Sequence, residues 1–220
     1  MRERPILFSG PMVRALLEGR KTQTRRAVKV QSPDGVWSPE RDGKWWPTNG
    51  EDYVDTGVAC PYGKPGDRLW VRETWGAVPR LAGCEKVCPE RDHDGQGIRY
   101  RATWDRVHSV RWRPSIHMPR VASRISLEIT EVRVERLQDI SEDDARAEGL
   151  KAITKDGHTV KYGIPDSDGF PGTDDTGWPW AEWNVDPRKA FRRLWERING
   201  AESWAANPFV WVLSFQRVTP

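Results

Sequence analysis

Residues 16–26 read LLEGRKTQTRR, and this stretch decides how the rest of the chain is interpreted. It overlaps the segment 9–18, which predicts a short helix with Ser9 as a possible cap, Pro11 in the first turn and apolar side chains along one face. Gly19 predicts the end of that helix. The cations that follow therefore begin at a helix C-terminus, where backbone carbonyls favour positive charge.

Lys21 and Thr24 in this stretch could form a nucleophilic pair. A threonine hydroxyl attacks poorly near neutral pH until a base removes its proton, and a lysine becomes that base when burial or nearby cations lower its pKa. The sequence supplies cations in Arg20, Arg25 and Arg26. Side chains three positions apart face opposite sides of a strand, so a shared site requires the segment to bend. The alternative is an ordinary solvated loop.

Acyl transfer to threonine also requires an acid that protonates the departing amine, and a carboxyl group in an apolar pocket can do this. Two glutamates are candidates. Glu73 lies on a predicted strand over 69–74 and faces inward, and an ion pair with an arginine is its alternative role. Glu148 lies at the end of a short helix predicted over 140–149, where Ser141 and Asp144 form a capping-box pattern. A solvated helix face is the alternative role of Glu148.

The remaining patterns predict few regular elements. A helix is expected over 186–200, capped by Asp186, with an apolar face of Phe191, Leu194, Trp195 and Ile198. Strands are expected over 99–104, 125–130 and 207–218. Irregular regions rich in Gly, Pro, Asp and Trp lie at about 31–63, 76–110 and 151–185. Together these features predict a single α+β domain over 1–220: a small mixed β-barrel with flanking helices and three long loop insertions.

Composition limits the class of protein. The chain is 37% hydrophobic and 30% charged, which is typical of a globular domain, and no apolar run is long enough to span a membrane. The N-terminus lacks the layout of a secretion signal, so we expect a cytoplasmic protein. A net charge of +3 is too small to make the whole surface bind nucleic acid. The 13 tryptophans and the arginines could still stack on RNA bases locally.

The three cysteines are an odd number, which argues against a disulfide framework. Cys60, Cys84 and Cys88 could instead complete a tetrahedral zinc site with His93. The spacing of Cys84 and Cys88 is unusual for zinc, and Cys60 is distant in the sequence. Free thiols are therefore the first interpretation, and a zinc that staples the loops is the second.

Several motifs together resemble an ASCH domain of the PUA-like superfamily. They are GRKT within LLEGRKTQTRR, the KPGDRLWV turn and strand over 64–71, the ITEVRV strand over 129–134 and the ISEDDARAEG helix over 140–149. The whole chain is similar to the longer ASCH proteins that phages and prophages often carry. The resemblance covers the first 30 residues, 64–75, 118–150 and 186–218. The insertions fall outside the minimal domain.

This resemblance implies an activity. The best characterised members are small bacterial amidohydrolases that cleave N4-acetylcytidine, a modified nucleoside, into cytidine and acetate. On this sequence their lysine base falls on Lys21, their threonine nucleophile on Thr24 and their acidic glutamate on Glu148, and no cofactor is implied. The insertions could enlarge or close the pocket, which leaves the acyl group and the base open. An RNA-binding module and a ribonuclease of the same superfamily are the alternatives.

Substrate binding would require further groups. Trp75, Glu73 and His117 could stack on a nucleobase or bind its edges, and each has a purely structural role as its alternative. Arg26, or backbone amides near 22–25, could stabilise the oxyanion that forms during acyl transfer.

Overall fold

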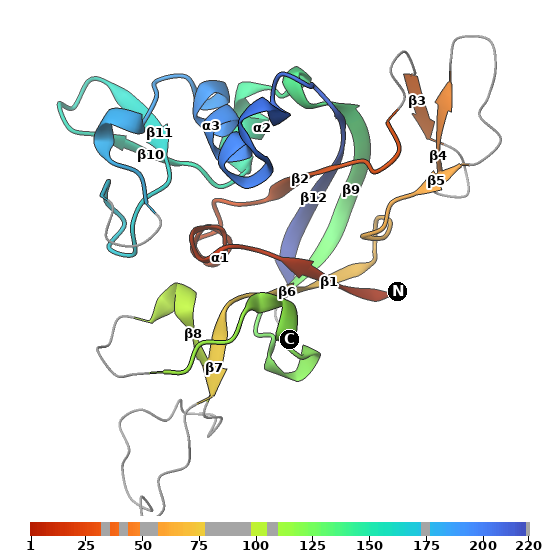
Figure 1. Cartoon of the computed structure of the whole chain (residues 1–220), viewed down its shortest axis with the longest axis horizontal. Coiled ribbons are helices and arrows are strands. Elements are labelled where there is room, and N and C mark those ends of the chain that lie inside the picture. The colour runs from red at the N-terminus through yellow and green to blue at the C-terminus, as the bar shows by residue number, and fades with distance from the viewer. Residues whose placement is uncertain are drawn as a thin grey trace, which may run out of the picture.

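The centre of the structure is a five-stranded mixed sheet (Figure 1). The computed structural model describes residues 1–31, 36–39, 44–48, 57–77, 98–104, 110–172 and 177–218. In sheet order the strands are β1 (Glu3–Leu7), β6 (Arg68–Arg72), β9 (Ser126–Arg136), β12 (Phe209–Val218) and β2 (Gln23–Ala27). β1 and β6 run parallel, and the other neighbours are antiparallel.

Strand β12 holds the sheet together because it pairs with β9 along its whole length and with β2 over Val210–Ser214. Its first residues, FVWVL, are all buried, so the strand is covered on both faces and reads as a continuous apolar run. Trp211 at its centre packs edge-on against Trp37 and Trp45. The strand predicted over 207–218 is confirmed.

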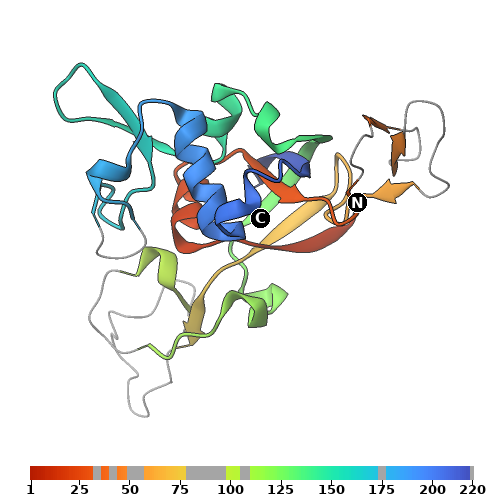
Figure 2. The same cartoon turned by 45° about the horizontal axis from the view of Figure 1, so that its top comes forward.

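In the described parts of the chain, three α-helices accompany the sheet: α1 (Gly10–Leu17), α2 (Glu142–Ala147) and α3 (Pro187–Asn199). Ser141 caps α2 by accepting from the backbone N–H of Asp144, and Asp186 caps α3, as the sequence predicts. Ser9 precedes α1 but makes no side-chain cap. Figures 1 and 2 both show α3 on the β2 side of the sheet. No helix in the described ranges is long and apolar enough to cross a membrane.

The sheet agrees with the predicted α+β class, but the expected barrel closure is not found. Among the described residues, no backbone ladder joins the edge strands β1 and β2. The only described hydrogen bond from the β2 residue Arg26 to β1 is made by its side chain, whose Nη2 donates to the carbonyl of Leu7 at 2.8 Å. The edges of the sheet are thus linked by a guanidinium, which leaves room for side chains between them.

The predicted loop insertions carry small sheets of their own, which Figure 1 shows around the central sheet. One has three strands: β3 (Val36–Pro39), β4 (Lys44–Thr48) and β5 (Val58–Ala59). Two are two-stranded: β7 (Trp75–Ala77) with β8 (Ile98–Tyr100), and β10 (Lys151–Thr154) with β11 (Val160–Gly163). The short 3-10 helices are η1 (Arg101–Thr103), η2 (Ser115–His117), η3 (Arg120–Ala122), η4 (Leu137–Asp139), η5 (Trp180–Glu182) and η6 (Ala201–Ser203). The strand expected over 99–104 therefore ends early, where η1 begins.

The GRKTQTRR segment both bends and extends. Gly19 ends α1 with a φ of +75°, and Lys21 then forms an isolated antiparallel bridge with Glu148. Strand β2, which the sequence did not predict, begins only at Gln23. Because Lys21 lies before the strand, its side chain is not bound by the alternation of β2 and can share a side with that of Thr24.

Gly149 is required where α2 turns toward Lys21. Its φ is +103°, and an added Cβ would lie 3.0 Å from Ala15 Cβ and 3.1 Å from Lys21 Cβ. We predict that Gly149→Ala lowers the free energy of unfolding by about 2 to 3 kcal/mol, because backbone strain adds to a clash. Gly157, with a φ of +76° and open space around it, is the matched control, and Gly157→Ala should cost about 1 kcal/mol. Equal losses in chemical denaturation would contradict the packing argument.

Candidate active site

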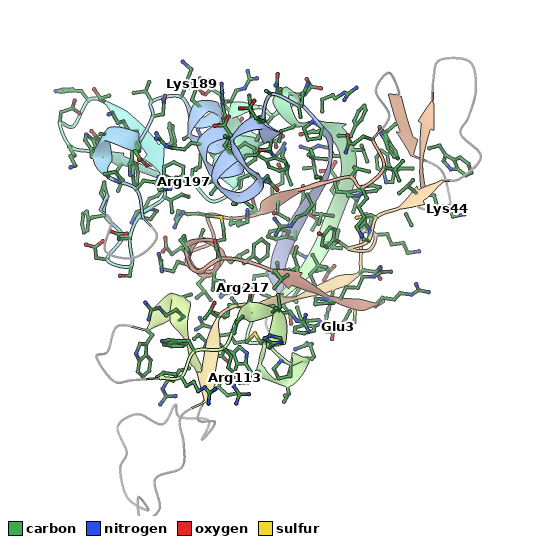
Figure 3. The ribbon with its side chains drawn as sticks, viewed as in Figure 1. Glu3, Lys44, Arg113, Lys189, Arg197 and Arg217 are labelled. Atoms are coloured by element: carbon green, nitrogen blue, oxygen red, sulfur yellow. The ribbon has the colours of Figure 1, made fainter. Side chains whose placement is uncertain are left out.

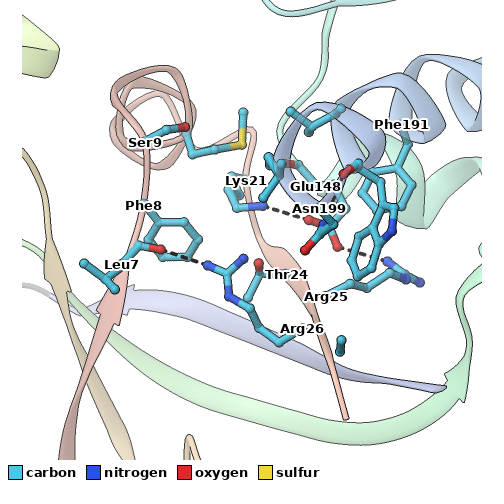
Figure 4. A pocket seen from close by; sticks show the side chains of 15 residues that line it. Leu7, Phe8, Ser9, Lys21, Thr24, Arg25, Arg26, Glu148, Phe191 and Asn199 are labelled. Carbon is cyan, nitrogen blue, oxygen red and sulfur yellow. Dashed lines mark hydrogen bonds and ion pairs between the residues drawn. The ribbon is translucent and has the colours of Figure 1, made fainter. Parts of the chain in front are cut away.

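A pocket of about 170 Å³ opens between the edge strands β1 and β2 and the helices α1 and α3 (Figure 4). Its apolar walls are Leu7, Phe8, Met12, Ala27, Phe191, Leu194, Trp195 and Ile198. Its polar lining is Ser9, Lys21, Thr24, Arg25, Arg26, Glu148 and Asn199. Four of the residues singled out from the sequence, Lys21, Thr24, Arg26 and Glu148, therefore meet in one hollow. The α3 wall is the apolar face that the sequence predicts for that helix.

The amine of Lys21 is buried beside Glu148. Its Nζ donates to the carboxylate Oε2 of Glu148 at 2.9 Å and to the backbone carbonyl of the same residue at 2.8 Å. Only 2% of the Lys21 side chain and 4% of the Glu148 side chain are exposed. Burial lowers the pKa of Lys21, and Arg26 and Arg25 act in the same direction, although Glu148 opposes the shift. Lys21 therefore gives up its proton more readily than a solvated lysine.

Local structure explains why these two residues meet. Glu148 is the C-cap of α2, so its carbonyl is one of those left without a partner at the helix end. The Lys21 amine satisfies that carbonyl and binds the carboxylate of the same residue. Arg20 donates to the next carbonyl, that of Gly149. The helix end is thus closed by the two cations of the GRKT motif, which explains part of the charge in that stretch.

Thr24 faces the same pocket from β2. It is 1% exposed, and its hydroxyl makes no hydrogen bond within the described residues. Figure 4 shows this hydroxyl and the Lys21 amine in the same hollow, with the amine bound to Glu148 rather than to Thr24. The hydroxyl is therefore available to a ligand, and the amine must change partner before it can accept the hydroxyl proton.

Arg26 lies at the opening of the pocket. Its guanidinium is held by the Leu7 carbonyl and lies 5.4 Å from the centre of the Phe8 ring, and the Lys21 amine lies 5.5 Å from the same ring. Its Nε and Nη1 make no hydrogen bond to the described residues. A cation with donors to spare next to Thr24 suits the stabilisation of negative charge that develops there.

Sequence reasoning missed the connections of Arg25, which it treated only as a nearby cation. The Arg25 side chain is fully buried and binds Glu148, Asp144 and Glu135 together. These acids lie 110 to 123 residues away in the chain, so no local spacing could reveal the contacts. Asp144 drew attention only as part of a helix cap.

The predicted substrate-binding residues Glu73, Trp75 and His117 do not line this pocket. The chain leaves the central sheet after β6, so these residues join the region around β7 instead. Glu73 is buried in an ion pair with Arg124, at 2.9 and 3.0 Å, and burial raises the pKa of Glu73 although Arg124 opposes the shift. Trp75 packs in a small second core, and His117 is exposed on η2. The ion pair with an arginine that was the alternative for Glu73 is therefore present, and Trp75 is part of a core.

The zinc hypothesis falls mostly outside the described residues, which exclude Cys84, Cys88 and His93. Cys60 is a buried free thiol, and burial raises its pKa to about 11. Within the described part of the chain, no group of three or more histidine, cysteine, aspartate or glutamate residues could hold a metal ion.

Comparisons of the chain with protein-family models, curated proteins and solved structures gave no match. The likeness to ASCH domains therefore rests on the sequence motifs, and a functional argument rests on the pocket.

The buried Glu73–Arg124 pair gives a prediction about stability, and an exposed ion pair of the same chain serves as its control. Removing Arg124 leaves a buried carboxylate without its partner, so Arg124→Ala should lower the free energy of unfolding by about 2 to 3 kcal/mol. Arg120 pairs on the surface with Glu3, which Figure 3 labels, and Arg120→Ala should cost less than about 1 kcal/mol. Urea denaturation at neutral pH measures both variants. A loss no larger for Arg124→Ala than for Arg120→Ala would contradict the assigned role.

Proposed function

We propose that this chain is an amidohydrolase that removes the acyl group from N4-acylated cytosine nucleosides, converting N4-acetylcytidine and water into cytidine and acetate. One observation carries the proposal: a buried lysine–glutamate pair shares a pocket with a threonine hydroxyl that has no hydrogen-bond partner among the described residues. The three residue types, Lys21, Thr24 and Glu148, are also those that the ASCH resemblance implies. The α+β fold is compatible with that family, although its barrel is not found.

The Lys21–Glu148 pair can supply a base and an acid at once. In the ion pair the proton lies on Nζ, 2.9 Å from Oε2. Transfer of this proton along the hydrogen bond gives a neutral amine and a carboxylic acid, with no change in the charge of the pair. The dry pocket favours this neutral form, because burial penalises both charges.

Acylation then follows from these groups. The neutral Lys21 amine accepts the hydroxyl proton of Thr24, and the hydroxyl oxygen bonds to the acyl carbon, whose carbonyl oxygen becomes negative. The Arg26 guanidinium stabilises that oxyanion. As the carbon–nitrogen bond breaks, Glu148 donates its proton to the exocyclic amine, and cytidine leaves.

Deacylation reverses the proton flow. The ionised Glu148 accepts a proton from water, which attacks the acyl-threonine. The protonated Lys21 returns a proton to the Thr24 oxygen, and the carboxylic acid product departs. The pair is back in its neutral form, ready for the next turnover. Phe8, Phe191 and Trp195 give the pocket aromatic walls on which a nucleobase can stack.

Three substitutions test the assigned roles with purified protein and N4-acetylcytidine. Lys21→Met and Thr24→Val should lower kcat by about a thousandfold or more, because each removes a group the acylation step cannot replace. Glu148→Gln should lower kcat by about a hundredfold or more through loss of the acid. Chromatographic detection of cytidine measures the rates, and circular dichroism confirms that each variant folds.

Exposed residues of the same types provide matched controls. Lys29→Met and Thr22→Val change side chains at the surface, two to eight positions away, and should leave kcat unchanged. An unreactive wild type, or a Thr24→Val variant as fast as Thr22→Val, would refute the proposal. RNA binding, the alternative from the sequence, stays a prediction that salt-dependent affinity would test.

The dependence of kcat/KM on pH should be bell-shaped, because the pair works with one proton. At low pH the pair carries a second proton, so Lys21 is charged and cannot act as the base. At high pH the pair has lost its only proton, so Glu148 cannot act as the acid. Since burial lowers the pKa of Lys21, the alkaline decline should begin below the ordinary lysine value of 10.5. Steady-state rates across this range measure the limbs. A rate still rising beyond 10.5 would contradict the assignment of Lys21.

A further inference from the structure

We propose that Asp144 and Glu135 draw the Arg25 guanidinium away from Glu148 and thereby keep Glu148 able to hold a proton. This inference deepens the proposed function and rests on it, since it concerns the acid of that reaction. Neither Asp144 nor Glu135 lines the pocket, so both are positioning residues that act through Arg25.

The distances around Arg25 show where the guanidinium is held most closely. Its Nη2 lies 2.5 Å from Glu135 Oε1 and 2.9 Å from Asp144 Oδ2, and its Nη1 lies 2.6 Å from Gln23 Oε1. The contact of Nη1 with Glu148 Oε1 is the longest of the set, at 3.2 Å. Glu148 has its shorter carboxylate contact with Lys21, at 2.9 Å.

Whether Arg25 or Lys21 is the closer partner of the Glu148 carboxylate decides whether Glu148 can act as an acid. A guanidinium keeps its protons at any ordinary pH, so a carboxylate held mainly by Arg25 would stay ionised. A lysine amine can transfer its proton, so a carboxylate held mainly by Lys21 can become the acid. The two carboxylates on the far side of Arg25 therefore favour the form of Glu148 that the reaction needs.

The groups around Asp144 and Glu135 also favour a guanidinium of Arg25 that is held by these two carboxylates. Arg133 donates to Asp144 at 2.6 Å and to Glu135 at 3.1 Å, which fixes both carboxylates in place. Although burial acts in the opposite direction, Arg25 and Arg133 hold the pKa of Asp144 below its usual value, so this carboxylate is charged when it binds Arg25. The charged groups around the pair are Arg20, Arg25, Arg26, Arg133, Glu135 and Asp144. The pocket residues from α1 and α3 are uncharged.

Asp144→Asn tests the inference, with Glu131→Gln as the matched control. Each removes one carboxylate charge and one partner of Arg133, but Glu131 makes no contact with Arg25. In carbon-13 NMR of glutamate-labelled protein, the Glu148 carboxyl signal is assigned by its loss in Glu148→Gln. At neutral pH we expect Asp144→Asn to move this signal toward that of an ionised carboxylate, because Arg25 is released toward Glu148. Glu131→Gln should move the signal far less.

The rate of N4-acetylcytidine hydrolysis is the second readout. Because less of the enzyme then holds a proton on Glu148, kcat of Asp144→Asn should fall about tenfold while Glu131→Gln keeps the wild-type rate. Equal NMR shifts in the two variants would overturn the role of Asp144 even in an active enzyme. An inactive wild type with the expected NMR shifts would overturn the amidohydrolase and leave this electrostatic role standing. Should Asp144→Asn fail to fold, Glu135→Gln replaces it with the same expected outcomes.

Discussion

The contact between the Lys21 amine and Glu148 is the interaction on which the site depends. It joins residues 127 positions apart, ties the turn after α1 to the end of α2, and leaves both charges almost without solvent. Such a pair stabilises a fold weakly, because desolvation offsets most of the attraction between the charges. Under the proposed function, the pair keeps one movable proton beside the pocket, and the absence of a side chain at Gly149 allows the close approach.

The pocket exists because the central sheet stays open. Backbone pairing between β1 and β2 would bring the two edges together and leave no space for a ligand. Instead, Arg26 reaches across to Leu7, and the Phe8 ring lies beneath two cations. The apolar face of α3 lines another side of the pocket, and its low polarity strengthens the electrostatic interactions beside it.

The sequence predicts local features of this arrangement well. The apolar run of β12, the caps Ser141 and Asp186, and the glycine stop after α1 each act within a few residues, and the structure follows them. Lys21 and Thr24 were proposed as site residues because their residue types suit a known chemistry, and both line the same pocket. The contacts of Arg25 with its carboxylate partners were not predicted. They join residues more than a hundred positions apart, and no local sequence pattern indicates such contacts. Glu73 was misplaced because an inward-facing strand residue does not reveal which cavity it faces.

The most specific step of the proposed reaction is the transfer of the acyl group to the oxygen of Thr24. Rapid acid quenching of the enzyme during turnover of N4-acetylcytidine, followed by peptide mass spectrometry, tests this claim directly. We predict an acetyl group on Thr24 that is lost on longer incubation and is absent from Thr24→Val. Turnover with an acetyl group on Lys21 instead would contradict the central role given to this threonine.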